Sequence, residues 1–145
     1  MTASNVGSGF LLIVHTKGEN PLHDTIVDMV DMDKERATPP SSFTWETVQG
    51  FTRSYPSIPG LASSSARVLD TIPIGTMGDA RNLHFNFFSI NGAWHQRLNL
   101  RIVDGRWIQA TRVWKDPDQS KNKQMKILYE DVPPNYPKAN GKVDW

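Results

Sequence analysis

The chain has 145 residues, a length that predicts a single domain over residues 1–145 with its own hydrophobic core. It carries 16 Lys and Arg against 15 Asp and Glu, and the resulting net charge of +1 excludes a general electrostatic attraction to nucleic acid or to a membrane surface. It contains no cysteine, which excludes disulfide scaffolds and thiolate metal sites, and it has no apolar run near the ~20 residues that cross a bilayer.

The first third of the chain predicts one buried strand and one ambiguous segment. Residues 1–8 are small and polar, which indicates a loose lead-in to an apolar strand over residues 10–16. The cluster at residues 17–21 is typical of a turn. Residues 22–33 fit a helix that begins after Asn20, but their four aspartates and several β-branched residues favour a strand.

The middle of the chain predicts loops and short elements before one further strand. Residues 37–42 indicate a loop, and residues 43–51 a short helix or an irregular strand. Two prolines and a glycine within residues 55–65 argue against a long regular element there. Residues 66–74 predict a strand that ends at Gly75.

Residues 81–114 carry the strongest local signal. Their aromatic and β-branched runs are typical of strands. Two dipeptides, Asn91-Gly92 and Asp104-Gly105, supply the positive φ angles that type I′ hairpin turns require. The segment therefore predicts three antiparallel strands joined by two-residue turns.

The end of the chain changes from polar to apolar and back. Residues 115–126 predict a mobile polar loop, and residues 127–132 a last short strand. The remaining residues, 133–145, form a tail with three prolines.

The two hairpin turns also predict a register. They place Ile90 opposite Ala93 and Val103 opposite Arg106, and alternation along each strand then separates two faces. The apolar face predicts the core, and its residues are Leu83, Phe85, Phe87, Trp94, Leu98, Leu100, Ile102, Trp107, Thr111 and Val113. The other face is basic, polar and aromatic, and its residues are Asn82, His84, Asn86, Phe88, His95, Arg97, Asn99, Arg101, Arg106, Ile108, Ala110, Arg112 and Trp114.

The basic face contains one electrostatic anomaly. The predicted register forms an aromatic row of Phe88, His95 and Trp114. The next row places Arg97 directly opposite Arg112, where like charges repel by roughly a few tenths of a kcal/mol unless an anion or a carboxylate lies between them.

Two explanations account for this anomaly, and the first, which is the more common arrangement in proteins, is internal. Strand or loop carboxylates elsewhere in the fold, such as Asp24, Asp28 or Asp31, would pair with the arginines. The tail would then cover Phe88 and Trp114.

The second explanation is a binding surface for another protein or an anionic ligand. Nucleic acid is a less favoured partner, although cations beside aromatic planes also suit single strands. A homodimer through the exposed aromatic side chains stays open, and no membrane partner is expected. The residues of the expected binding surface are Arg97, Arg101, Arg112, Phe88, His95 and Trp114.

The sequence nominates no catalytic residue and no cofactor. It has no nucleophile elbow and no phosphate-binding loop, so we favour a non-catalytic binding module over an enzyme. The predicted register separates His84 from His95 by ~13 Å, which is too far for one metal ion. His15 and His23, with Asp24, would approach one ion if their strands pair, but half-buried structural histidines are expected instead, and we predict no metal site.

A set of turn and core residues carries a family resemblance over much of residues 10–145. It comprises residues 20–24 leading into Val30-Asp31, and then Phe87-Phe88-Ser89, Gly92, Trp94, Gly105-Arg106-Trp107, Ala110-Thr111-Arg112-Val113 and Asp144-Trp145. This set is similar to small bacterial immunoglobulin-like domains of uncharacterised function. The resemblance implies a β-sandwich and a strand over residues 22–32, and it implies no activity. The Gly105-Arg106-Trp107 hairpin is also similar to the late strands of cone-shaped folds of the nuclear-transport-factor type.

We therefore predict an all-β fold, an antiparallel immunoglobulin-like sandwich of seven or eight strands. Its core would form between the apolar face of residues 81–114 and the strands at residues 10–14 and 66–74. The alternative is an α+β cone, with helices over residues 22–36 and 43–54 around a pocket that binds a small ligand or catalyses a reaction. The cytoplasm is the expected compartment, and an extracytoplasmic one stays open in case a leader was removed.

Overall fold

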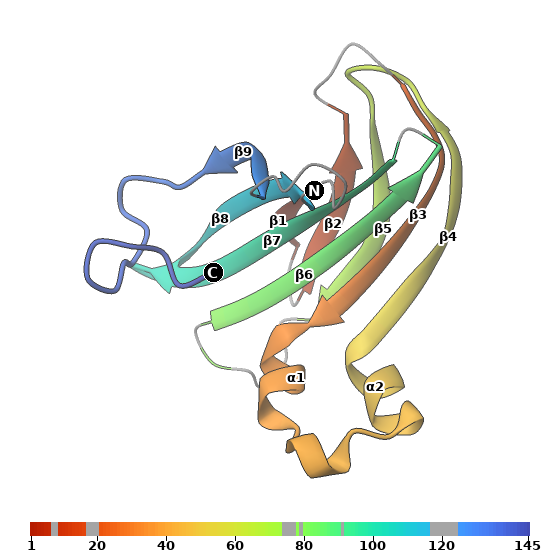
Figure 1. Ribbon diagram of the computed structural model, residues 1–145. Helices are drawn as coiled ribbons and strands as arrows, with labels where there is room; N and C mark the ends of the chain where they lie inside the picture. Colours follow the sequence, from red (N-terminus) through yellow and green to blue (C-terminus); the bar gives the residue numbers. More distant parts are fainter. Residues whose placement is uncertain (7–8, 17–20, 74–77, 79, 91, 117–124) are drawn as a thin grey trace.

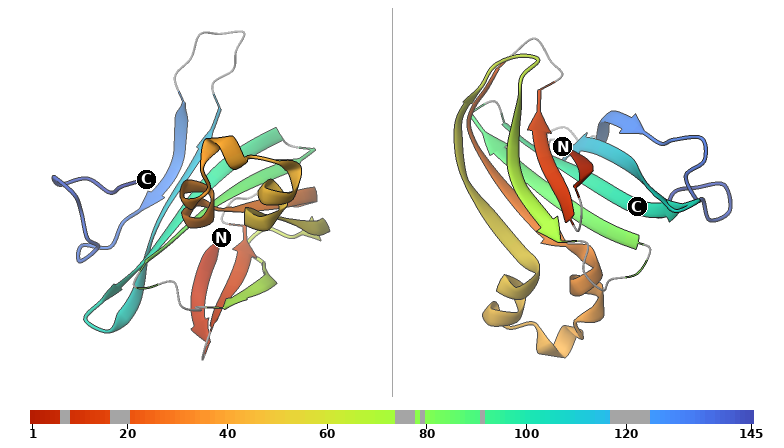
Figure 2. Two further views of the ribbon diagram at one scale, coloured as in Figure 1. Left: turned by 90° about the horizontal axis from the view of Figure 1, so that it is seen from below. Right: turned by 180° about the vertical axis from the view of Figure 1, so that it is seen from behind.

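Two antiparallel β-sheets pack face to face in the computed structural model, which describes residues 1–6, 9–16, 21–73, 78, 80–90, 92–116 and 125–145 (Figure 1). Seen from behind, the smaller sheet lies in front of the larger one, and β8 and β9 extend past its edge (Figure 2). The smaller sheet has the order β1-β2-β5, and its strands are β1 (Thr2–Val6), β2 (Gly9–His15) and β5 (Ala66–Pro73). The larger sheet has the order β4-β3-β6-β7-β8-β9, and its strands are β3 (Leu22–Asp31), β4 (Thr52–Leu61), β6 (Ala80–Ser89), β7 (Gly92–Val103), β8 (Arg106–Lys115) and β9 (Lys126–Asp131).

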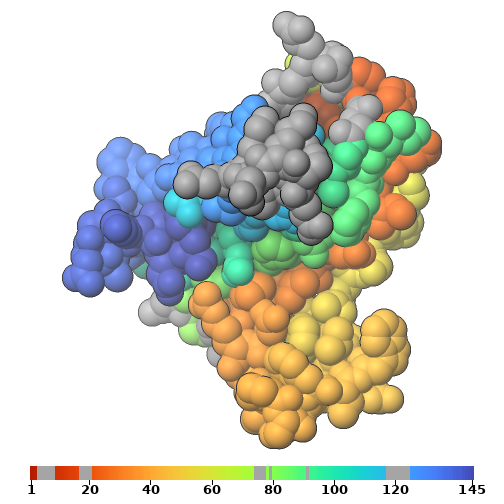
Figure 3. All heavy atoms as spheres, in the orientation of Figure 1, coloured from red at the N-terminus to blue at the C-terminus, as the bar shows by residue number. Residues whose placement is uncertain are grey.

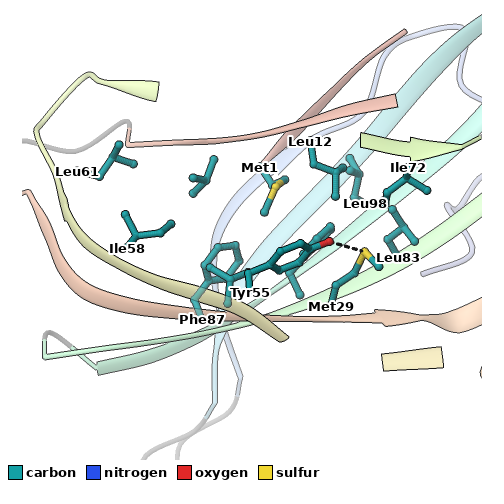
Figure 4. Close-up of a cluster of buried hydrophobic side chains, with 13 residues drawn as sticks. Met1, Leu12, Met29, Tyr55, Ile58, Leu61, Ile72, Leu83, Phe87 and Leu98 are labelled. Atoms are coloured by element: carbon teal, nitrogen blue, oxygen red, sulfur yellow. Dashed lines mark hydrogen bonds between the residues drawn. The ribbon is translucent and has the colours of Figure 1, made fainter. Parts of the chain in front are cut away.

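The core fills the space between the two sheets. Alternation along each strand places one set of side chains inward, and the close-up shows apolar residues of both sheets meeting there (Figure 4). Phe10 on β2 packs edge-on against Trp107 on β8, with ring centroids 4.9 Å apart. Trp94, Ile102, Trp107 and Val113 are half-buried. The predicted core face is confirmed, since its members Leu83, Phe85, Phe87, Leu98, Leu100 and Thr111 are buried.

Two short helices connect β3 to β4 at one end of the larger sheet (Figures 1 and 3). The first, α1 (Met32–Ala37), begins after Asp31, whose carboxylate accepts a hydrogen bond of 3.2 Å from the backbone N–H of Lys34. A 3-10 turn (Pro40–Ser42) and α2 (Trp45–Phe51) follow it. The strand preferred for residues 22–33 is thus confirmed as far as Asp31, and the helical alternative is wrong for that part.

Polar contacts fasten α1 to β6. Arg81 and Asp31 form a buried ion pair with an Nη2–Oδ2 distance of 3.2 Å. Asp33, in the first turn of α1, accepts a hydrogen bond of 2.8 Å from the backbone N–H of Asn82. These contacts fix α1 at the end of the larger sheet. The charges of Glu35 and Arg36 on this helix act on Arg97 at the outer face of that sheet.

Two predictions about regular structure are wrong. Residues 2–6, expected as a loose lead-in, form β1 and pair with β2. Segment 55–65 was expected to lack a long element, but Thr52–Leu61 forms a ten-residue strand. This strand tolerates Pro56 and Pro59 because β4 lies at the edge of its sheet and both prolines are exposed there. The described part of the chain therefore holds nine strands, against the seven or eight predicted.

The predicted polar loop at residues 115–126 is shorter than expected. Lys115 belongs to β8 and Lys126 to β9, and these two residues pair across the strands. The rest of that prediction falls on residues 117–124, which lie outside the described part of the chain, as do the predicted turn at residues 17–20 and the predicted end of β5 at Gly75.

Candidate functional site

The outer face of the larger sheet, which points away from the smaller sheet, carries the predicted binding residues. On β7 and β8 the pairing matches the prediction, with Arg97 opposite Arg112 and His95 opposite Trp114. The Asp104-Gly105 turn joins these strands, and its two φ angles are 51° and 72°, as a type I′ turn requires. The like-charge pair is therefore present in the structure.

The pairing of β6 with β7 differs from the prediction by two residues. Ser89 lies opposite Gly92, so the loop begins one residue earlier than predicted. Asn91 lies outside the described residues. The difference of two keeps every side chain on its predicted face but changes its neighbours, and His84 therefore lies opposite Arg97.

The corrected register brings two histidines and a tryptophan into one cluster. The ring centroids of His84 and His95 are 5.6 Å apart, and that of Trp114 lies 5.5 Å from each. Asn86 Oδ1 lies 2.9 Å from His84 Nε2 and 2.7 Å from His95 Nδ1, and Asp116 lies 2.9 Å from His95 Nε2. The predicted separation of ~13 Å is wrong, because it followed from the two-residue error in register.

Burial governs the protonation of His84. It lowers the pKa of this histidine, and the charges of Arg97 and His95 lower the pKa further, while the hydrogen bond with Asn86 acts in the opposite direction. The Nδ1 atom of His84 is buried without a hydrogen-bond partner in the described part of the chain. Burial and the charge of Arg97 thus both favour the neutral form of the His84 ring.

Arg112 has partners on two sides. Its Nε donates a hydrogen bond of 2.6 Å to Glu130 on β9. Its guanidinium lies 4.4 Å from the ring centroid of Trp145, at the end of the tail. The internal explanation is thus confirmed for Arg112, and the pairing carboxylate is Glu130 on β9 instead of one of the three aspartates named as examples.

Arg97 has no such partner. Among the described residues its side chain forms no hydrogen bond or ion pair, and its Nη1 atom is buried. Burial lowers the pKa of Arg97, the charge of Arg36 lowers it further, and the charges of Glu35 and Asp144 act in the opposite direction. A guanidinium that has lost part of its water without gaining a hydrogen-bond partner is the most unusual feature of this face.

The two arginines line a small pocket. It encloses about 190 Å³ and is lined by Arg97, Arg112, Trp114, Met125 and Trp145. The two tryptophans come from β8 and from the tail, so the pocket depends on the tail lying against the outer face (Figure 3). We name these five residues the arginine pocket.

Arg101 does not join this pocket. It lies four residues along β7 from Arg97, where its Nη2 donates a hydrogen bond of 2.8 Å to Asn82 Oδ1. The tail covers this region, since Tyr136 is buried and the backbone carbonyl of Asp144 accepts a hydrogen bond of 2.7 Å from Asn99. Arg101 is therefore a structural residue.

Phe88 also lies apart from the predicted aromatic row. It is opposite Ala93 on β7, which was predicted to face Ile90, and opposite Ile26 on β3. Phe88 and Ile26 are 44% and 46% exposed, so the tail does not cover Phe88 as the internal explanation expected. Of the six predicted binding residues, the structure brings together Arg97, Arg112, His95 and Trp114.

The aspartates predicted to compensate the arginines do not do so. Asp31 pairs with Arg81 instead. Within the described residues, neither Asp24 nor Asp28 forms an ion pair. The acidic segment lies on β3, which is separated from β7 and β8 by β6, and this position explains the difference.

Among the described residues, no group of three or more His, Asp or Glu side chains is placed so that it could hold a metal ion. The strand pairing that would have brought His15 near His23 does not form. Strand β2 pairs with β1 and β5 in the smaller sheet, whereas β3 pairs with β4 and β6 in the larger one.

Four residues of this site lay outside the predicted set. Met125 was seen in the sequence as part of a polar loop, Trp145 as a tail residue, Glu130 as part of a last strand, and His84 as a member of the basic face too far from His95 to share a site with it. For Glu130 a signal existed, because a last strand beside β8 would place an acidic residue next to the arginine of that strand. The position of Trp145 depends on how the tail folds back, and no local pattern predicts it.

Comparison with known protein families, with curated proteins and with solved structures found no match. The resemblance to immunoglobulin-like domains thus has the support of the two-sheet antiparallel architecture alone. No helix in the described residues combines the length and the apolar character needed to cross a membrane.

Proposed function

We propose that the protein is a non-catalytic binding module that takes a carboxylate group in the arginine pocket. The observation that carries this proposal is that Arg97 and Arg112 both line the arginine pocket, while the Arg97 side chain forms no hydrogen bond or ion pair among the described residues. A carboxylate bound there would give the guanidinium of Arg97 an acceptor. It would also separate the like charges of Arg97 and Arg112, which lie directly opposite each other.

The two guanidinium groups of the pocket support a planar anion. A guanidinium donates through parallel N–H groups whose spacing matches the two oxygens of a carboxylate. The volume of about 190 Å³ accommodates the end of a larger ligand and not a whole cofactor. The rings of Trp114 and Trp145 provide apolar walls beside the charge, and these walls favour a carboxylate attached to an apolar group.

Nucleic acid is the less supported partner. A strand of nucleic acid needs several cations spaced along its backbone, together with exposed stacking planes. Arg101 is engaged with Asn82 beside the tail, and Phe88 lies away from Trp114. The remaining charges are concentrated in one place, which suits a single anionic group.

Calorimetric titration with N-acetylglutamate tests the proposal. We expect Arg97→Gln to weaken binding by about tenfold or more, because a hydrogen bond to a charged group contributes about 1.5–3 kcal/mol. The matched control is Arg106→Gln, since Arg106 is an exposed arginine at the start of β8. It removes the same charge from the protein without touching the arginine pocket.

Two results would overturn the proposal. The first is equal weakening by both substitutions, which would indicate a general effect of net charge. The second is no binding of N-acetylglutamate by the parent protein when the tail is intact.

The finer assignment of the fold, an immunoglobulin-like domain, belongs to the same proposal. Two packed antiparallel sheets support it. An immunoglobulin-like assignment must also explain why the sheets have three and six strands, and why β6, β7, β8 and β9 are neighbours in chain order.

A homodimer would use the exposed side chains of Phe88 and Ile26. Sedimentation of the parent protein and of Phe88→Ser would detect it.

A further inference from the structure

A second concave site lies on the opposite face of the same sheet. A cavity of about 500 Å³ opens between the sheets, where β8 and β9 extend past the edge of the smaller sheet (Figure 2). Its walls come from both sheets. The apolar and aromatic side chains that line it are Met1, Val14, Leu22, Phe87, Trp94, Val113, Leu128 and Tyr129.

The wall carries a stacked aromatic pair. Phe87 on β6 and Trp94 on β7 lie opposite each other, and their rings are nearly parallel at 8°, with centroids 5.7 Å apart. Aromatic rings of a ligand pack well in offset or edge-on contact with such a pair. This part of the cavity therefore suits a planar, apolar body.

The buried polar groups of the cavity already bond to one another. Gln96 is 2% exposed, and its Nε2 donates to Thr111 Oγ1 at 2.6 Å and to the backbone carbonyl of Met1 at 2.9 Å. The hydroxyl of Thr111 lies 3.2 Å from the carbonyl of Arg97, to which it donates. A ligand inside would thus be held by apolar contact and not by hydrogen bonds to these groups.

The mouth of the cavity has a different character. A shallower hollow shares Leu22, Trp94, Val113 and Leu128 with the cavity and continues outward to Pro21, His23 and Lys115. Lys115 is half-buried, and in the described part of the chain it forms no ion pair. A cation at the end of an apolar cavity favours a ligand with one anionic end.

The size excludes a simple packing defect. Voids in protein cores rarely exceed the size of a water molecule, whereas ligand sites occupy roughly 300–1,000 Å³ and are mostly apolar with a few polar groups at their edge. The cavity has that volume, and its lining combines apolar side chains with the polar side chains of Thr2, His15, Gln96, Gln109, Thr111 and Asp131. A small ligand would fill it without any rearrangement of the sheets.

We propose that the cavity between the sheets binds a small aromatic carboxylic acid, with its apolar body against Phe87 and Trp94 and its carboxylate at Lys115. The site is separate from the arginine pocket, because alternation along β8 directs Val113 inward and Arg112 and Trp114 outward. The ligand would therefore enter from the edge of the sheet and not through its outer face.

The test uses 2-naphthoic acid and its uncharged analogue 2-naphthamide as probes, with the Arg97→Gln protein as background. This background removes the arginine pocket as a competing carboxylate site, so failure of one proposal leaves the other intact. Binding is followed by tryptophan fluorescence. We expect Val113→Trp, which fills the cavity, to abolish binding of both probes, and the exposed control Val68→Trp to leave it unchanged.

The charge at the mouth is tested by Lys115→Gln. This change should weaken binding of the acid about three- to fivefold and leave binding of the amide unchanged. The matched control is Lys126→Gln, which removes a charge from the residue paired with Lys115 on β9 but outside the mouth. Equal effects of the two lysine substitutions would overturn the assigned orientation.

A measurement on the protein with an unsubstituted cavity does not depend on whether the cavity variants fold. The indole N–H signal of Trp94 should shift on addition of 2-naphthamide, while the signals of Trp114 and Trp145 stay in place. No shift of the Trp94 signal, or a shift confined to the outer tryptophans, would overturn the proposal.

Discussion

Arg81 and Arg97 belong to the same sheet but differ in their electrostatic partners. Arg81 is buried with Asp31 as its partner, whereas Arg97 faces Arg112 and has no partner among the described residues. Removing one member of a buried ion pair leaves the other charge uncompensated. Removing an unpartnered charge releases repulsion instead. The same substitution should therefore cost far more stability at Arg81 than at Arg97.

We predict that Arg81→Met lowers the free energy of unfolding by about 3–5 kcal/mol. Arg97→Met should change it by no more than about 1 kcal/mol. Urea unfolding followed by tryptophan fluorescence measures both. A loss at Arg97→Met as large as that at Arg81→Met would show that the guanidinium of Arg97 has an internal partner, and it would remove the main support for the arginine pocket.

His84 predicts a pH dependence of stability. Its pKa in the folded protein is lowered by burial, whereas in the unfolded chain it titrates near 6.5. The unfolded chain therefore binds the proton first, so the stabilising contribution is present above pH ~6.5 and is lost as the pH falls below that value. The sign follows from the lowered pKa.

Urea unfolding at pH 7.5 and pH 5.5 measures this contribution. The parent protein should lose more stability between the two pH values than His84→Gln does. The exposed His23 supplies the control, and His23→Gln should behave like the parent. An identical acid loss in parent and His84→Gln would contradict the account of His84.

At the scale of elements, the hairpins show what a turn sequence can and cannot predict. Asp104-Gly105 predicted its loop correctly, and with it the pairing of β7 with β8. Between β6 and β7 the same reasoning displaced the loop by one residue and the pairing by two. An error of two residues leaves every side chain on its correct face, because side chains alternate with a period of two. It does change which residues lie opposite each other on neighbouring strands. The core was therefore predictable, and the neighbours of His84 were not.

The correct turn leads to a prediction about Gly105. This glycine has a φ of +72°, a conformation that costs side-chain-bearing residues about 1–2 kcal/mol. Gly105→Ala should lower the free energy of unfolding by about 1 kcal/mol or more. Gly60 is the control, because an added Cβ there meets no atom within 4 Å and its φ is ordinary. Equal stabilities of Gly105→Ala and Gly60→Ala would contradict the assigned turn.

Strand β4 shows why the proline content of residues 55–65 led to a wrong prediction. Prolines exclude a segment from the middle of a sheet but not from its edge. Whether a strand lies at the edge depends on the order of all six strands, which no local pattern contains. For the same reason the pairing of β1 with β2 was missed, although the apolar pattern of residues 10–16 located β2 itself.

At the scale of the whole molecule, one sheet serves two proposed sites. Alternation directs Val113 into the cavity and Arg112 and Trp114 to the outer face. The sequence allowed the basic face to be predicted, since that follows from local alternation. It did not allow the cavity or the position of Trp145 to be predicted, because these depend on how the smaller sheet and the tail pack against β7 and β8.

The central claim is that an anionic group occupies the space between Arg97 and Arg112. The most direct measurement follows the indole N–H signals of the five tryptophans by NMR during titration with N-acetylglutamate. The account predicts saturable shifts of Trp114 and Trp145, little change at Trp94, and loss of these shifts in Arg97→Gln. Unchanged signals of Trp114 and Trp145, or equal shifts in Arg97→Gln, would contradict it.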